Sequence, residues 1–412
     1  MSATTLHFST ESTKQLIASL PNLGYIGDVP IERSYHGSLV LYRLLENYPA
    51  GSLTVVETAT ESISAQRLTD VPYVALPMRS RWLDTRFHSL VLSWSMIRAA
   101  RPDFLNKLGD LNFDAVMTVA HGLGWLLAAA VAGEAGVPLH LIMHDDWPRV
   151  ANVPQQFRNW LDRSFARVYR QASSRMCVSP FMREDYLARY RCDAEVLYPS
   201  RAKNSLDFET VPTRMRPDDA QLTIAFAGTI NSAGYVRVLR QLSQSLSEIG
   251  GRLLLFGPIS HDSAKQHGLD DQHVVLGGLL SPSDLIVRLR NEADALFVPM
   301  SFDRSERSNM EMAFPSKLAD YTATGLPLLI YGPSYCSAVR WANDNPGVAE
   351  VVAVEDQGLL SAALRRLESA NTRVTLGQRA IEVGRAFFSH DAAQRTFHDA
   401  LSSGCRTLLL SD

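Results

Sequence analysis

The stretch that decides the fold is residues 314–330, which read FPSKLADYTATGLPLLI. Pro315 suits the first position of a helix, where its missing N–H costs nothing and its φ is already helical. Gly325 suits the left-handed residue that ends a helix, and Pro327 stops that helix from continuing. The apolar run 328–330 is typical of a parallel strand covered on both faces. The stretch therefore predicts a short helix followed by a buried strand.

The start of this predicted helix carries the chemistry. Free N–H groups and the positive end of the helix dipole favour an anion there, and Ser316 and Lys317 add a hydroxyl and a full charge. Asp320 follows at i+4 and i+3 from these two residues, so all three share a face. A phosphate at the helix start and a ribose diol on the carboxylate fit this spacing. The alternative is an exposed Lys317–Asp320 pair on a surface helix.

Length and composition limit the class of protein. A chain of 412 residues with 46% apolar residues predicts two domains with large cores. The net charge of −3 gives no argument for a nucleic-acid partner. Four scattered cysteines without metal or redox spacing predict a reducing cytoplasm, no disulfide framework and no metal site. The first 15 residues lack a signal-peptide core, and the apolar region 122–143 is too interrupted to span a membrane.

Strands and helices alternate through the first half. We expect a strand at 14–20, a flexible loop at 22–27, a helix at 37–47 and a strand at 53–57. Further strands are expected at 115–119, 139–143, 176–178 and 195–198, separated by helices at 125–135, 155–172 and 180–190. This alternation predicts an α/β fold with a doubly wound parallel sheet, in which ligands bind beyond the carboxyl ends of strands.

Two such strand ends carry candidate catalytic residues. His121 follows one strand, and His144 and Asp145 follow the next. Each histidine could instead be a structural cap. Gly122 and Gly124 lie between a strand and a helix, which faintly matches a dinucleotide-binding fingerprint, but the third glycine of that motif is missing. The glycines more simply allow a ligand or the other domain to approach the backbone.

Tryptophans and arginines of the first half allow two interpretations each. Aromatic faces can stack on sugars, but core packing is the commoner use. Five tryptophans are concerned: Trp82, Trp94, Trp125, Trp147 and Trp160. The arginine-rich stretch 158–175 could face a membrane, or it could be the solvated side of an amphipathic helix.

A polar stretch at 200–221 reads as the interdomain linker, and a second alternating series follows. Strands are expected at 222–227, 252–256, 274–278 and 295–299, with helices at 236–248 and 281–293. Gly228 and Thr229 begin a small loop fit for backbone amides to approach a phosphate. The polar loop 300–313 supplies Arg304 and Arg307.

These motifs resemble glycosyltransferases with two facing Rossmann-like domains, the GT-B fold, and most closely the large retaining family four. The resemblance covers nearly the whole chain. Its carriers are Ala227-Gly228-Thr229 after a strand, Phe256-Gly257-Pro258, Gly277-Gly278, Ala293-Asp294-Ala295, the stretch 314–327, Val178-Ser179-Pro180, Tyr198-Pro199-Ser200 and Phe387-Phe388-Ser389-His390. The resemblance implies an N-terminal acceptor domain at 1–205, a donor domain at 215–385 and, at 386–412, a last helix that crosses back to the N-terminal domain.

The family's donor-binding residues carry over only in part. Asp320 occupies the place of the second glutamate of the acidic pair, which implies a bond to ribose. The first glutamate falls at Met312, and Glu311 lies one residue away. The usual Arg and Lys after the Gly-rich loop are absent, because residues 230–235 contain no base. Phosphate charge then falls to Lys317, with Arg304 or Arg307.

The sequence thus predicts an enzyme that moves a sugar from a nucleoside-diphosphate sugar to an acceptor, without metal or other cofactor. The resemblance to the family implies retention at the anomeric carbon. The acceptor could be a carbohydrate, a lipid-linked molecule or a small molecule. The sequence also allows peripheral contact with a membrane and association with a partner glycosyltransferase. The alternatives are a nucleotide-sugar epimerase or phosphorylase on the same fold, or an inactive glycosyltransferase-like partner subunit.

Overall fold

A computed structural model describes residues 20–33, 36–59, 66–78, 87–99, 102–108, 111–212, 221–230 and 232–409. The chain divides into two compact units. Unit 1 is formed by 1–197 and 393–412, and unit 2 by 198–392. The strand predicted at 14–20 lies outside the described residues except for Leu20, and so does Trp82.

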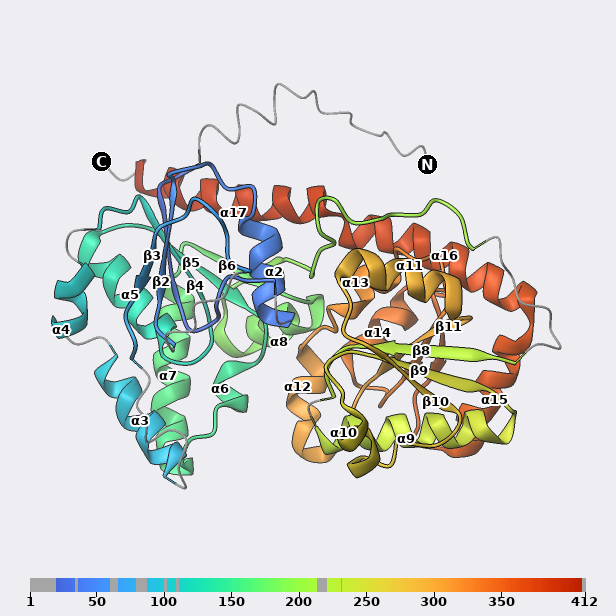
Figure 1. Ribbon diagram of the computed structural model, residues 1–412. Helices are drawn as coiled ribbons and strands as arrows, with labels where there is room; N and C mark the ends of the chain where they lie inside the picture. Colours follow the sequence, from blue (N-terminus) through green and yellow to red (C-terminus); the bar gives the residue numbers. More distant parts are fainter. Residues whose placement is uncertain are drawn as a thin grey trace. The chain divides into compact units, whose positions relative to one another are not determined.

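Unit 1 is built on a β-sheet with helices packed around it (Figure 1). In the described residues this sheet is parallel and has seven strands in the order β3-β2-β1-β4-β5-β6-β7. The strands are β1 (Leu23–Gly27), β2 (Leu53–Glu57), β3 (Tyr73–Ala75), β4 (Ala115–Val119), β5 (Leu139–Met143), β6 (Ser174–Cys177) and β7 (Glu195–Val196). Their helices are α2 (His36–Leu45), α3 (His88–Arg98), α4 (Pro102–Leu105), α5 (Gly124–Ala135), α6 (Trp147–Val150), α7 (Gln155–Gln171) and α8 (Pro180–Tyr190). The strand order reverses between β1 and β4, and this is where ligands bind in such sheets.

The flexible loop predicted at 22–27 was wrong, because this segment is the central strand β1. All five of its residues are buried. Its glycines serve close approach rather than flexibility: a Cβ added at Gly24 would lie 2.8 Å from the ring of Phe113. Glycine in a strand often marks such an approach, so a loop cannot be inferred from glycine content alone.

Unit 2 contains the second parallel sheet, with six strands among the described residues in the order β10-β9-β8-β11-β12-β13. The strands are β8 (Thr223–Ala227), β9 (Arg252–Phe256), β10 (Val274–Gly278), β11 (Ala295–Pro299), β12 (Leu328–Tyr331) and β13 (Ala349–Val352). Helices follow as α9 (Ala233–Glu248), α10 (His261–Gln266), α11 (Pro282–Glu292), α12 (Arg307–Met312), α13 (Lys317–Tyr321), α14 (Ser337–Asp344), α15 (Gln357–Glu368) and α16 (Ala370–Phe388). The order reverses between β8 and β11. The two sheets confirm the predicted α/β fold with two Rossmann-like halves.

The last helix, α17 (His390–Leu409), returns the chain to unit 1. Phe397 and Leu401 are fully buried in the same core cluster as β1 and β2. Gln394 Nε2 donates to the carbonyls of Arg43 and Leu44 at the end of α2, at 3.1 and 2.9 Å. The C-terminal helix predicted by the resemblance is therefore part of the core of unit 1.

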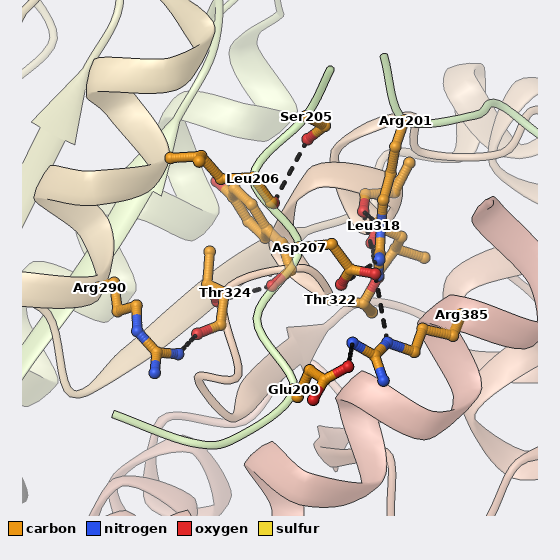
Figure 2. A network of polar contacts seen from close by, with 12 residues as sticks. Arg201, Ser205, Leu206, Asp207, Glu209, Arg290, Leu318, Thr322, Thr324 and Arg385 are labelled. Carbon is orange, nitrogen blue, oxygen red and sulfur yellow. Dashed lines mark hydrogen bonds and ion pairs between the residues drawn. The ribbon is translucent and has the colours of Figure 1, made fainter. Parts of the chain in front are cut away.

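The described part of the predicted linker, 200–212, is fixed to unit 2 (Figure 2). Arg201 is buried and donates to the carbonyl of Ala319 at 3.0 Å, to Thr322 Oγ1 at 3.1 Å and to Asp207 Oδ1 at 2.7 Å. Arg385 of α16 holds the other oxygen of Asp207 at 3.2 Å. Through Arg201 this stretch therefore supports α13. Residues 213–220 lie outside the described part of the chain.

Candidate functional site

Glycine turns end the strands on one side of the sheet in unit 2. Gly228 follows β8 with φ +143°, and Gly257 follows β9 with φ +142°. A Cβ added at Gly257 would lie 2.4 Å from the carbonyl oxygen of Gly228, so the two turns touch. Only glycine fits this approach. The backbone of the loop after β8 therefore packs closely against the carboxyl edge of the sheet, next to the reversal of strand order.

Lys317 extends its side chain across Gly228. A Cβ added at Gly228 would meet Lys317 Cε at 2.4 Å and Nζ at 2.9 Å. The ammonium lies 5.2 Å from the ring centroid of Phe226 on β8. Burial lowers the pKa of Lys317 to about 8. Among the described residues no carboxylate forms an ion pair with Lys317, so the exposed Lys317–Asp320 pair is not what the structure contains.

Tyr321 sets the position of this lysine. Its hydroxyl accepts from the backbone N–H of Ala227 at 2.7 Å and donates to the carbonyl of the same residue at 3.3 Å. Helix α13 is thereby tied to the carboxyl end of β8, four residues after Lys317. Asp320 lies beside Tyr321, and its charge acts on the neighbouring Arg201. The structure therefore brings Gly228 and Lys317 together beside β8; Thr229 follows Gly228 in the chain, and Asp320 lies three residues after Lys317 on α13.

The predicted helix start at Pro315 was wrong by two residues. Regular helix begins at Lys317 and lasts five residues. The carbonyls of Pro315 and Ser316 accept i+3 bonds from Leu318 and Ala319, both at 3.1 Å, which makes the entry a tight turn. The Ser316 hydroxyl makes no capping bond. A helix this short offers little dipole, so the side chain of Lys317 is the main positive group here.

Arg304 and Arg307 line a separate cavity of about 440 Å³ beyond β11, β12 and β13. Its other lining residues are Phe302, Pro333, Tyr335 and Glu355. Arg307 already pairs with Glu311 at 2.8 Å and lies 4.5 Å from the ring centroid of Tyr335. Met312, at the place of the family's first glutamate, is buried. The structure thus places the two arginines on the other side of the strand reversal from Gly228.

In unit 1 the amides at the start of α5 are already occupied. Asp28 Oδ2 accepts from the N–H groups of Leu123 and Gly124 at 2.6 and 2.5 Å. A Cβ added at Gly124 would lie 2.6 Å from Cα of Gly27. The glycines therefore admit the side chain of Asp28 and the backbone of Gly27, both from their own unit. A dinucleotide phosphate has no free amide pair here, which argues against that interpretation.

Asp28, His121, His144 and Asp145 gather near the strand reversal of unit 1. Burial raises the pKa of Asp28 and of Asp145, and the charge of His121 opposes both shifts. Burial lowers the pKa of His144 to about 4, so this imidazole is neutral at neutral pH. His121 is the exposed member, and its ring lies 4.6 Å from the ring centroid of Trp147. The cluster can exchange protons and hydrogen bonds with a polar ligand.

The tryptophans and arginines considered as ligand-binding or membrane-facing residues fall into buried, exposed and structural groups. Trp125 and Trp147 are buried in unit 1, as the core interpretation predicts, whereas Trp94 is exposed. On α7 and the strand after it, four arginines donate to backbone carbonyls of their own unit: Arg158, Arg163, Arg170 and Arg175. These arginines are structural, which favours the surface-helix interpretation of this stretch over a membrane-facing one.

Sequence reasoning missed Asp28, Tyr321 and Arg201. Asp28 directly follows β1 and Tyr321 is the last residue of α13, but their partners lie about 95 residues away along the chain. Phe226 also escaped notice because it reads as core. A carboxylate directly after a strand was the one available signal, and the incorrect loop at 22–27 concealed it.

Comparison with known proteins agrees with this architecture. Residues 53–200 match the model of Glycosyltransferase Family 4. No curated protein sequence matches the chain.

Solved structures show the same fold. The chain is similar to sucrose-phosphate synthase from Thermosynechococcus elongatus, at 14% identity over 95% of this chain and 99% of that one, with a TM-score of 0.67. It is similar to HepE of Anabaena in complex with UDP, at 13% identity over 92% and 99%, with a TM-score of 0.64. It is also similar to α,α-trehalose 6-phosphate synthase from Burkholderia multivorans, at 13% sequence identity. That match covers 94% of this chain and 97% of the other, with a TM-score of 0.62.

The chain therefore has the GT-B fold. Residues 53–200 match Glycosyltransferase Family 4, and the whole chain shares the fold of the solved GT-B glycosyltransferases. No helix in the described residues is long and apolar enough to cross a membrane.

Proposed function

We propose that this protein transfers a hexosyl group from a nucleoside-diphosphate sugar to an acceptor, and that unit 2 binds the donor. The observation that carries the proposal is Lys317. A half-buried ammonium beside a glycine turn, with no ion-pair partner in the described chain, is a site that a diphosphate would complete. HepE has been solved with UDP and with UDP-glucose on the same fold, which supports a uridine nucleotide as the first donor to test.

In this proposal Lys317 stabilises the charge that develops on the leaving diphosphate as the glycosidic bond breaks. Asp320 accepts the ribose hydroxyls. A protein cation in this place supports transfer without a metal ion, and the resemblance supports retention at the anomeric carbon. His121, His144 and Asp145 of unit 1 are assigned to the acceptor and the transferred sugar. The cavity at Arg304 and Arg307 is proposed to add positive charge for the donor. Location in the cytoplasm stays a prediction from the cysteine pattern.

A donor panel tests the proposal. The chain is incubated with uridine, guanosine and adenosine diphosphate sugars, with a chelator present, and thermal unfolding and release of nucleoside diphosphate are measured. A ligand at about a hundredfold over its Kd stabilises the folded state by roughly 2.7 kcal/mol. We expect one nucleotide family to raise the melting temperature, and release to require an acceptor.

Other outcomes would select the alternatives. Conversion of the donor sugar without any acceptor indicates an epimerase. Phosphate-dependent cleavage indicates a phosphorylase. Donor binding without turnover, together with copurification of a second glycosyltransferase, indicates a partner subunit. Failure of every nucleotide to bind contradicts the proposed donor site itself.

A further inference from the structure

Helix α3 buries Leu92 and Met96, yet it also exposes a second set of large apolar side chains. Leu90, Trp94 and Ile97 are 61, 56 and 59% exposed, whereas Ser93 and Ser95 are each 7% exposed. A helix that only covers its own domain turns its large apolar side chains inward and its serines outward. The packing of Leu92 and Met96 explains the buried face of α3, but the exposed apolar side chains need another explanation.

The exposed side chains form one continuous stripe. Phe87, directly before the helix, is 44% exposed, and it is followed by Leu90, Trp94 and Ile97 at intervals of three, four and three residues. These intervals place all four side chains on one helical face. We call these four residues the α3 stripe. Singly exposed apolar residues are ordinary, but an aligned set of four marks a binding surface.

Positive charge accompanies the stripe. The guanidinium of Arg98 lies 4.3 Å from the ring centroid of Trp94. Lys107, in the turn after α4, is exposed. In the sequence, residues 79–107 carry six Lys or Arg and two Asp, a net charge of +4 in a chain whose net charge is −3. Because Arg98 lies on the stripe itself, a partner of the stripe should be apolar and carry negative charge.

We propose that the α3 stripe inserts into the surface of a lipid bilayer that contains anionic lipids. Tryptophan and arginine together favour the boundary between headgroups and acyl chains, where the ring is buried and the guanidinium meets phosphate. Basic residues next to an anionic leaflet add attraction that salt screens. The helix would lie in the interface rather than cross it. This proposal does not rest on the donor site, since α3 belongs to unit 1 and the donor site is assigned to unit 2.

Vesicle flotation tests the proposal with the full chain. The vesicles consist of phosphatidylcholine alone or of phosphatidylcholine with phosphatidylglycerol. The test variant combines Leu90→Gln, Trp94→Gln and Ile97→Gln. The matched control combines Leu279→Gln and Val354→Gln, which replace side chains 76 and 58% exposed in unit 2. Unchanged melting temperatures and oligomeric states establish that both variants are folded.

We expect the wild-type chain and the control to float with the anionic vesicles at low salt and to bind neutral vesicles weakly. The stripe variant should bind about a hundredfold more weakly, because three partly buried apolar side chains are lost from the bilayer. Arg98→Gln should lower the affinity less, and its effect should vanish at high salt. Equal flotation of the stripe variant and the wild type would overturn the proposal. So would a wild-type dimer that ignores vesicles and dissociates in the stripe variant, since a second copy would then cover α3.

Discussion

At the scale of single residues, the account depends on one ammonium group. Lys317 has lost water around its charge without gaining a carboxylate among the described residues, and burial lowers its pKa to about 8. Such a group binds an anion more strongly than a surface lysine does, because less water must be displaced. The sequence could predict Lys317, since its chemistry is local. It also predicted Gly228 and Lys317 at one carboxyl edge of the sheet. It did not predict Phe226 as a neighbour, because this residue reads as core.

Lys317→Ala should lower kcat/KM by a factor that corresponds to about 1.5–3 kcal/mol, since a charge-assisted bond to phosphate is lost. Steady-state turnover of the donor found in the panel measures this. Lys265→Ala, at an exposed position of α10, is the matched control and should behave as the wild type. Full activity of Lys317→Ala would show that the diphosphate does not depend on this residue.

The pH dependence of kcat/KM for the donor should follow the titration of Lys317. Lys317 is charged below its pKa of about 8 and neutral above it. Donor kcat/KM should therefore be highest below pH 8 and should fall as the pH rises through about 8. Lys317→Arg removes this fall, because a guanidinium stays charged. A wild-type profile that stays flat from pH 7 to 9.5 would contradict the assignment, those limits being roughly one unit or more either side of the titration.

At the scale of elements, α13 is held by its surroundings rather than by its own hydrogen bonds. Five residues are too few for a stable isolated helix. Tyr321 ties the helix to β8. Arg201 donates to the carbonyl of Ala319 and to the hydroxyl of Thr322 at the end of the helix (Figure 2). The sequence predicted the helix through Pro315 and Gly325. Both contacts that fix it are long-range and carry no local pattern.

Arg201→Lys should destabilise the chain and raise the KM for the donor. Lysine cannot reach Ala319, Thr322 and Asp207 together, and leaving buried acceptors without bonds costs about 1–3 kcal/mol. The melting temperature and KM are measured with and without nucleotide. Arg385→Lys, which changes a partly exposed partner of the same Asp207, should cost less than about 1 kcal/mol. If both variants melt alike, Arg201 does not support α13 in the way described.

In unit 1, Asp28 has the corresponding role for α5. Asp28→Ala leaves the N–H groups of Leu123 and Gly124 without their acceptor, which should cost about 2 kcal/mol and lower the melting temperature. Asp103→Ala, at an exposed site of the same unit, is the control. Equal melting temperatures of the two variants would show that water replaces the carboxylate at no cost.

At the scale of the whole molecule, the sequence predicted the two alternating series because hydrophobic runs and glycine turns are local signals. It predicted nearly every strand of unit 2 to within a residue or two. It missed β1, whose glycines suggested a loop, and with it Asp28. It did place His121, His144 and Asp145 at neighbouring strand ends and Gly228 with Lys317 at another sheet edge, in two clusters. Those clusters follow from strand order, as in the reversals at β1/β4 and β8/β11.

The central claim is that unit 2 alone binds the nucleotide, at the strand reversal beside Lys317. Hydrogen exchange of the full chain, with and without the nucleoside diphosphate that gives the largest thermal shift, tests it most directly. The account predicts slower exchange in residues 225–235 and 314–323, and loss of that protection in Lys317→Ala but not in Lys265→Ala. Protection confined to residues 120–147 of unit 1, with none in unit 2, would contradict it and move the nucleotide to the cluster of His121, His144 and Asp145.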